Sequence, residues 1–306
     1  MPGFKSEGSG LPAGVRGVFA SIVASIGFGL VYFLTPLLHP MPAEVIWGIR
    51  AAATLPLVTV VLLASRDWRL VAEIAGRARR RPWLILGMLA TSLLMSIQMW
   101  IFAWAPLNGR AMQVALGYFL LPLVLVVVGR FLYKDRMAWW QWAAAGIALV
   151  GVAYEVVRIG GVSWETLTVA LGYPAYFVLR RAMGMNHLGG MWWEFALMLP
   201  LAAALIAIFF ADDAWAATNP SLWWSAPAIS LLSGIAMLLY LVASRLLPMS
   251  LFGLLSYVEP AMLLVASLMI GERIASDEWF TYGAIWAAVL VLVVGGAAEV
   301  RRMRGK

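Results

Sequence analysis

The chain has 306 residues, of which 63% are hydrophobic and only 12% are charged, and this composition excludes an ordinary soluble domain. It contains no cysteine, so disulfides, thiolate metal sites and cysteine nucleophiles are excluded as well. The net charge of +7 does not indicate nucleic-acid binding, because the basic residues fall in loops and form no patch interleaved with aromatic residues.

Ten apolar stretches, each long enough to cross a bilayer, fill most of the chain. A helix that rises 1.5 Å per residue needs about 20 apolar residues to cross a hydrocarbon core of about 30 Å. Residues 1–13 are polar and glycine-rich, and we expect them to form a disordered tail in the cytoplasm. The predicted spans are residues 14–38, 44–63, 83–103, 111–128, 140–157, 164–179, 191–210, 224–244, 250–270 and 280–299. The sequence therefore predicts an all-α membrane protein with ten transmembrane helices.

The distribution of lysine and arginine predicts the orientation of these spans. With the N-terminus in the cytoplasm, 18 of the 22 basic residues lie in inner segments, three (Arg110, Arg158 and Arg273) lie in outer segments, and Arg50 lies within the second span. Cytoplasmic loops of membrane proteins carry such an excess of basic residues. We therefore expect both termini and the loop of residues 64–81 to be cytoplasmic.

The fourth and ninth predicted spans share an order of residues. Tyr118 precedes Pro122 in the fourth, Tyr257 precedes Pro260 in the ninth, and an acidic residue followed by arginine comes after each apolar stretch. Since five spans are an odd number, the second copy enters from the opposite side of the membrane, as in many secondary transporters. The two expected domains are inverted five-helix repeats over residues 14–157 and 158–306. Small residues predict close packing of the last span of each repeat, at Ala144, Ala148, Gly283 and Ala287.

Short motifs spread over most of the chain carry a resemblance to a known family. They are residues 43–45 before Arg50, residues 108–109, residues 116–119 with Pro122, Tyr176 with residues 179–181, and residues 244–250 leading to Tyr257 and Pro260. Together they resemble the drug/metabolite transporter superfamily, EamA-type, and within it the RarD subfamily. The chain departs from the family pattern at Gln113, where glutamate is usual, and at Leu121, where asparagine is usual. The resemblance implies transport of small metabolites such as amino acids, sugars, nucleotide conjugates or drugs, so it bears on mechanism more than on cargo.

A single acid, Glu259, lies near the middle of the ninth span. A charge at that depth costs about 2.5 to 3.5 kcal/mol unless it faces a cavity or a partner. Glu259 is therefore either a tie between helices or a functional carboxyl, which would bind a substrate amine or couple transport to protons. Arg50 is its expected partner, because the two lie at similar depths. The alternative for Arg50 is that its long side chain reaches the outer headgroups.

Polar and aromatic residues on other spans are candidates for lining the same site. Tyrosine provides both a ring for stacking and a hydroxyl for orienting a polar group. Each such residue alone is more often a packing contact, so the prediction concerns the set, in which Tyr173 is a further member. The predicted substrate-binding residues are Glu259, Arg50, Gln98, Trp100, Gln113, Tyr118, Tyr176, Tyr240 and Tyr257.

Other classes of membrane protein are less consistent with the sequence. An intramembrane enzyme acting on a lipid or peptide needs a nucleophile with a base, or metal ligands, and the two histidines, His39 and His187, are assigned to opposite sides. No HExxH, GxSxG or Walker A motif occurs, so we expect no enzyme, cofactor or metal. A channel would require rings of like residues from symmetric subunits. A drug efflux permease of broad specificity also stays open.

We therefore expect a secondary active transporter in the bacterial inner membrane that works by alternating access. Its substrate would be a small metabolite, an amino acid or a related aromatic or amphiphilic compound, moved outward. The expected partners are this substrate, membrane lipid and a proton as coupling ion, with no nucleic acid, and the protein would be a monomer or a homodimer.

Overall fold

The computed structural model describes residues 13–108, 110–211, 218–262, 265 and 276–304, and these residues form helices without any strand. One short 3-10 helix, η1 (Thr35–Leu38), follows the first α-helix. The α-helices are α1 (Ala13–Leu34), α2 (Ala43–Ala64), α3 (Arg69–Arg80), α4 (Trp83–Leu107), α5 (Ala111–Phe131), α6 (Trp139–Ile159), α7 (Trp164–Ala182), α8 (Leu188–Phe210), α10 (Leu222–Leu246), α11 (Met249–Leu255) and α13 (Trp279–Arg304). The prediction of an all-α protein is confirmed.

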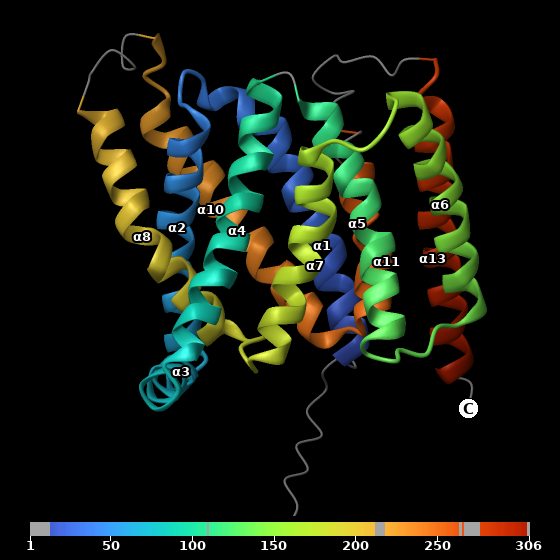
Figure 1. Cartoon of the computed structure of the whole chain (residues 1–306), viewed down its shortest axis with the longest axis horizontal. Coiled ribbons are helices and arrows are strands. Elements are labelled where there is room, and N and C mark those ends of the chain that lie inside the picture. Colours follow the sequence, from blue (N-terminus) through green and yellow to red (C-terminus); the bar gives the residue numbers. More distant parts are fainter. Residues whose placement is uncertain (1–12, 109, 212–217, 263–264, 266–275, 305–306) are drawn as a thin grey trace, which may run out of the picture.

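The long helices coincide with the predicted spans. Within the described residues, six helices are long and apolar enough to cross a membrane: α1, α2, α4, α6, α8 and α10. Shorter apolar helical segments occur in α5 and α13. Successive long helices run in alternating directions, and the start of α1, the helix α3 and the end of α13 lie at the same end of the bundle (Figure 1). The predicted tail lies outside the described residues except for Ala13, which begins α1.

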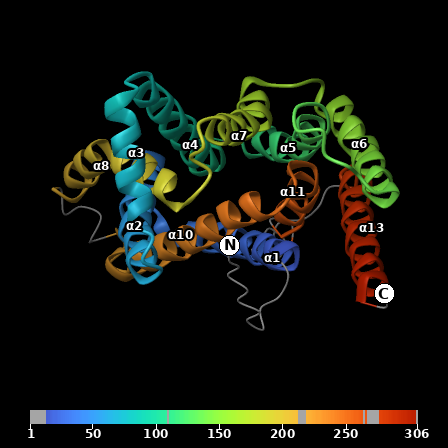
Figure 2. The same cartoon turned by 90° about the horizontal axis from the view of Figure 1, so that it is seen from below.

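The hydropathy pattern does not predict α3, which lies at one side of the bundle and packs against α8 and α4 (Figure 2). Val71 and Ile74 are buried against the bundle, whereas the arginines at the end of the helix are largely exposed. Arg77 donates a hydrogen bond to the carbonyl of Met183, and the Trp193 indole donates one to the carbonyl of Val71 at 3.0 Å. An apolar face with a basic opposite face is typical of a helix that lies at a membrane surface.

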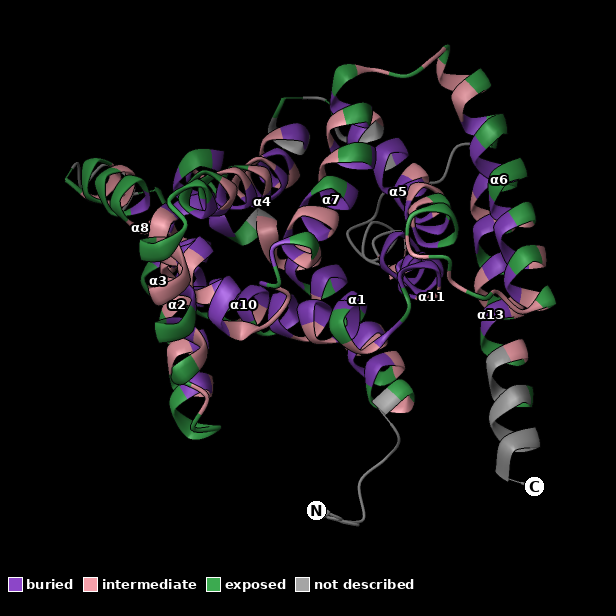
Figure 3. Ribbon diagram, turned by 60° about the horizontal axis from the view of Figure 1, so that its bottom comes forward, coloured by how far each residue is buried: buried purple, intermediate pink, exposed green. Residues whose placement is uncertain are grey.

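Exposed residues lie on the outer faces of the helices (Figure 3), and many of them are large and apolar. Phe131, Trp139 and Val157 are each more than three-quarters exposed. Small and polar side chains, by contrast, lie inside, among them Ser21, Ser25, Thr54, Thr91, Ser230 and Ser233. Lipid tails solvate an apolar surface, and helices in lipid pack through small residues and hydrogen-bonded hydroxyls. The described residues thus form a multi-pass membrane bundle.

Glycine brings several helix pairs into close contact. A Cβ atom on Gly117 of α5 would lie 2.7 Å from Cβ of Val169 in α7, and one on Gly151 of α6 would lie 2.7 Å from Cβ of Ala284 in α13. The predicted contact between the fifth and tenth spans is therefore present, and Ala144 and Ala148 are buried. The predicted register of α13 was wrong, however. Gly283 and Ala287 are exposed, whereas Ala284 and Ala288 face α6, because small residues occupy several faces of that helix.

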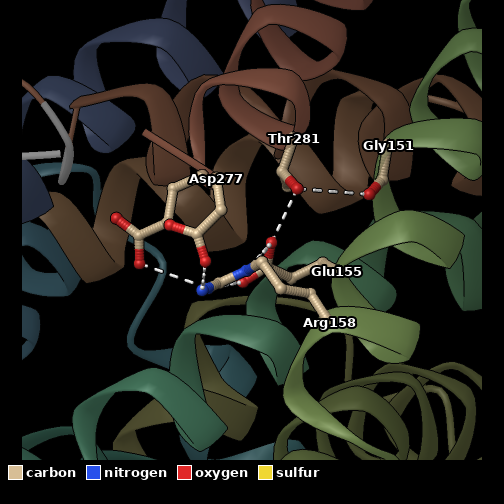
Figure 4. Close-up of polar contacts among 6 residues, drawn as sticks. Gly151, Glu155, Arg158, Asp277 and Thr281 are labelled. Carbon is tan, nitrogen blue, oxygen red and sulfur yellow. Dashed lines mark hydrogen bonds and ion pairs between the residues drawn. The ribbon is translucent and has the colours of Figure 1, made fainter. Parts of the chain in front are cut away.

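Charged residues also join α6 to α13 (Figure 4). Arg158 at the end of α6 contacts Glu155 at 2.5 Å, Asp277 at 2.9 Å and Glu278 at 3.2 Å. The Thr281 hydroxyl donates a hydrogen bond to the Glu155 carboxylate at 2.6 Å. The hydrogen bond from Arg158 lowers the pKa of the Asp277 carboxyl, which lies before the start of α13.

A second ion pair, fully buried, joins α7 to α8. Arg180 contacts the Glu194 carboxylate, and both side chains are at most 1% exposed. Tyr176 donates a hydrogen bond to Glu194 at 3.0 Å, and its hydroxyl accepts one from Arg180 at 2.6 Å. Arg180 also donates to the carbonyls of Met185 and His187, each at 3.0 Å. The sequence analysis had assigned Arg180 to a cytoplasmic segment, so it missed this network.

The close contact of α6 with α13 predicts a contrast between two glycines of the same helix. Gly151→Ala should destabilise the protein by about 1–3 kcal/mol, because the new methyl group overlaps Ala284. Gly146→Ala should be neutral, since a Cβ atom there has no neighbour within 4 Å. Thermal unfolding in detergent measures both. Equal melting temperatures for the two variants would contradict this helix packing.

The buried ion pair predicts a large effect of removing one charge. Glu194→Gln should destabilise the protein by about 3–5 kcal/mol, because Arg180 would remain buried without its counter-charge. Asp67→Asn is the control, since Asp67 pairs with Arg69 at an exposed position and should change stability little. Chemical unfolding compares the two variants. A Glu194→Gln variant as stable as Asp67→Asn would rule out an energetic role for the buried pair.

Candidate functional site

Arg50 lies on α2, and its side chain points into the bundle with 4% exposure. Its Nε donates a hydrogen bond to the Ser233 hydroxyl of α10 at 2.8 Å. The guanidinium carbon lies over the ring of Phe102 of α4, 5.5 Å from the centroid. These contacts exclude the alternative in which Arg50 reaches the outer headgroups. They hold the guanidinium between three helices in a fixed orientation.

Glu259 lies beside a break in the ninth predicted span. The helix α11 ends at Leu255, residues 256–257 form a turn, and helical residues resume at 258. Pro260 has no N–H group, so the carbonyl of Ser256 lacks the donor that a continuous helix would supply and instead accepts the Glu259 N–H at 3.2 Å. Glu259 is 5% exposed. Glu259 is therefore a buried carboxylate that lies next to an interruption in its helix.

Arg50 and Glu259 are close enough for their charges to interact. The expected direct ion pair between them was nevertheless wrong, because no N–O distance within 4.0 Å joins these two described residues. Ser233 and Phe102 already hold the arginine. The carboxylate of Glu259 has no hydrogen bond or ion pair to any other residue that the structure describes. The two opposite charges therefore lie near one another without forming an ion pair.

Three tyrosines lie near these charges. Ring centroids are separated by 6.0 Å for Phe102 and Tyr118, 6.3 Å for Tyr118 and Tyr173, and 6.4 Å for Tyr173 and Tyr240. All three tyrosines are within electrostatic range of Glu259. We name Arg50, Phe102, Tyr118, Tyr173, Tyr240 and Glu259 the central cluster. Three of its members precede residue 158 and three follow it.

Three of the other predicted site residues lie in separate environments. Tyr176 belongs to the Arg180–Glu194 ion pair. Gln98 donates a hydrogen bond to the carbonyl of Thr168 at 2.8 Å and so ties α4 to α7. Trp100 donates one to Glu44 at 3.0 Å and stacks on Trp104. These contacts assign the residues structural roles between helices and do not bring them into the central cluster.

Gln113 and Tyr257 also lie apart from the central cluster. The Gln113 carbonyl accepts a hydrogen bond from the Thr166 hydroxyl at 2.6 Å, and its side-chain oxygen is buried without a partner among the described residues. Tyr257 is fully buried beside Leu116 and Phe119, and its hydroxyl likewise has no partner in the described part of the chain. The structure therefore brings together Arg50, Tyr118, Tyr240 and Glu259 from the predicted set, with Tyr173.

Sequence reasoning missed Phe102 and Ser233. A weak signal existed for Ser233, because it lies seven residues before Tyr240 and so on the same face of α10. Phe102 lies four residues after Gln98 on α4, which again places two candidate residues on one face. Neither spacing distinguishes a site from a packing contact. No cluster of three or more histidine, aspartate or glutamate residues suitable for a metal ion occurs in the described residues.

Comparisons with known proteins agree with this architecture. A Pseudomonas aeruginosa protein named chloramphenicol-sensitive protein RarD is 41% identical over 295 residues, which cover 94% of this chain and 96% of the relative. A Haemophilus influenzae protein named uncharacterized transporter is 37% identical over 285 residues, covering 92% and 94% of the two chains. A crystal structure shares the fold with a TM-score of 0.65 at 18% identity, over 94% of this chain and 99% of the other.

No sequence profile of a protein family matches the chain. The relatives nevertheless extend over almost its whole length at identities well above 30%. Several of them are named transporters, and the long apolar helices are those of a multi-pass membrane protein. The motifs that suggested the resemblance lie within the aligned region. The chain therefore belongs to the RarD-like family of the drug/metabolite transporter superfamily.

Proposed function

We propose that this protein is a secondary active transporter that exports a small metabolite, an amino acid or a related aromatic or amphiphilic compound, by alternating access. The observation that carries the proposal is the central cluster, in which buried Arg50 and Glu259 lie near each other without an ion pair. If Arg50 and Glu259 served stability alone, they would form a direct ion pair, because two uncompensated charges in a low-dielectric interior are costly. Charges that are not paired with each other are available to bind a ligand.

Helix contacts support two inverted repeats of five spans. We take α1, α2, α4, α5 and α6 as the first repeat and α7, α8, α10, the chain from α11 onward and α13 as the second. Exchanging the two halves then converts the contact of α1 with α10 into that of α7 with α4, and the contact of α2 with α10 into that of α8 with α4. The pairs α2–α8, α5–α11 and α6–α13 map onto themselves. A pseudo-two-fold axis that relates the two repeats would pass between the two helices of each of these pairs.

The position of the central cluster fits this mechanism. Secondary transporters bind substrate where the two repeats meet, often beside interrupted helices whose free backbone groups contribute to the site. Glu259 follows the break after α11, and the cluster takes residues from both proposed repeats. Rocking of one repeat against the other would expose these residues to each side of the membrane in turn. A carboxyl without a partner is also suited to carry the coupling proton.

The alternatives explain fewer observations. An intramembrane enzyme has no support from the relatives, several of which are named transporters. A drug efflux permease of broad specificity is the stronger rival, since one relative is named for chloramphenicol sensitivity. Broad specificity is typical of flexible apolar surfaces, however, whereas Arg50 is held by Ser233 and Phe102. The fixed charge favours a substrate with a defined polar group.

The proposed topology predicts which loops lie on the cytoplasmic side of the bacterial inner membrane. Because the chain has no native cysteine, single cysteines report their own accessibility. Ala75→Cys in α3 should be protected from an impermeant thiol reagent added outside whole cells, whereas Val162→Cys, in the loop at the other end of the bundle, should react (Figure 1). After permeabilisation both should react. Labelling of Ala75→Cys in intact cells would reverse the orientation.

The proposed function predicts flux through liposomes that contain the purified protein. The liposomes are screened with labelled amino acids and aromatic metabolites, with and without a proton gradient. At least one of these compounds should accumulate inside them. Glu259→Gln and Arg50→Gln should each reduce the flux at least about 10-fold, because each removes a charge-assisted contact. Arg69→Gln is the matched control, since the Arg69 side chain is exposed and lies outside the central cluster.

Two results would count against this function. Absence of flux for every compound, with and without the gradient, would reject secondary transport of this class. Normal flux through the Arg50→Gln/Glu259→Gln double variant would reject the central cluster as its site. Melting temperatures of all variants separate lost binding from lost folding.

A further inference from the structure

We propose that Arg50 and Glu259 bind opposite ends of one zwitterionic substrate, with the guanidinium taking its carboxylate and Glu259 taking its ammonium group. The apolar or aromatic part of this substrate would contact Tyr118, Tyr173 and Tyr240, which lie near these charges. This inference rests on the proposed function and adds to it the charge pattern of the substrate. It also assigns each charged residue of the central cluster to one pole of that substrate.

Arg50 is oriented to receive a carboxylate. Its Nε is occupied by Ser233, and one face of the guanidinium lies on Phe102. Its two terminal nitrogens, Nη1 and Nη2, make no hydrogen bond to any other described residue. These nitrogens form one edge of the planar guanidinium, and a carboxylate binds such an edge through two parallel hydrogen bonds. The fixed contacts at Nε therefore leave the carboxylate-binding edge available.

Glu259 supplies the complementary charge. Its carboxylate is buried and has no hydrogen-bond partner among the described residues. An ammonium group donates up to three hydrogen bonds and would compensate this charge directly. Tyr118, Tyr173 and Tyr240 also lie near this carboxylate. Arg50 does not already take this role, since its Nε donates to Ser233 and no ion pair joins Arg50 to Glu259 in the structure.

The arrangement selects against ligands that carry one charge. An amine without a carboxylate would pair Glu259 and leave Arg50 uncompensated, and a carboxylate without an amine would do the reverse. A buried charge left without its counterpart costs more than its pairing gains, so polar sites reject analogues that lack one group. Both charges are satisfied together only by a dipolar ligand. The chain of rings from Phe102 to Tyr240 favours apolar or aromatic side chains on that ligand.

A series of three related compounds tests this inference on the purified, full-length protein. L-Phenylalanine carries both charges, 2-phenylethylamine lacks the carboxylate, and 3-phenylpropanoate lacks the amine. Calorimetry or ligand-induced thermal shifts should give the wild type an affinity for phenylalanine about 10-fold to 100-fold above that for either analogue. Arg50→Gln should abolish only the preference over phenylethylamine, and Glu259→Gln only the preference over phenylpropanoate.

Two further variants control for folding and for general charge effects. Arg50→Lys keeps the positive charge without the planar edge, so it should bind phenylalanine more weakly and retain its preference over phenylethylamine. Arg69→Gln removes a positive charge outside the central cluster and should keep both preferences. If Arg50→Gln fails to fold, the comparison of Arg50→Lys with wild type still tests the carboxylate contact.

The results separate this inference from the proposed function. Equal affinities of the wild type for all three compounds, no binding of phenylalanine, or preferences that survive both glutamine substitutions would each overturn the zwitterion assignment. If liposomes still carry other metabolites in that case, transport stands and only the assignment fails. If Glu259 serves solely as a proton carrier, phenylpropanoate will bind as well as phenylalanine, which would also overturn the assignment.

Discussion

Hydrocarbon cannot solvate a charge, and this constraint determines where the polar groups of the bundle lie. Its described buried charges fall into two classes. Arg180 with Glu194 is compensated by direct contact between neighbouring helices, and Arg158 near the bundle end contacts three acids. Arg50 and Glu259, by contrast, are buried without contacting each other. The first class fixes helices in place, whereas the second leaves charge available to a ligand.

Packing in lipid also requires close contact, because the hydrophobic effect does not drive helices together there. Gly27 brings α1 onto Ala236 of α10, Gly117 brings α5 onto α7, and Gly151 brings α6 onto α13. Each of these contacts joins a helix before residue 158 to a helix after it. The central cluster lies at the same junction, since its members come equally from both sides. Small residues thus hold together the two parts of the chain that together supply the candidate site.

Much of the helical architecture followed from hydropathy alone. Nine of the predicted spans match long helices to within about five residues, because an apolar stretch of this length has few alternatives to a helix in lipid. The ninth, residues 250–270, is interrupted after Leu255, and its residues 263–264 and 266–270 lie outside the described part of the chain. The helix α3 was missed since its short, strongly basic sequence carries no span signal. The register of α13 was misassigned because Gly283, Ala284 and Ala287 are all small, and composition does not indicate which face meets α6.

For the site, the sequence by itself determined that Arg50 and Glu259 lie within apolar spans, where charges are rare and therefore conspicuous, but it did not decide between a buried Arg50 and one that reaches the outer headgroups. It also identified Tyr118 and Tyr240 as candidates, but it could not separate them from Tyr176, Gln98 or Trp100. Only the tertiary structure decided that Tyr176 serves the Arg180 ion pair and that Ser233 and Phe102 hold Arg50. Those contacts join residues up to 183 positions apart. Hydropathy reports the depth of a residue along its own helix, whereas the direction in which it points depends on how the helices pack.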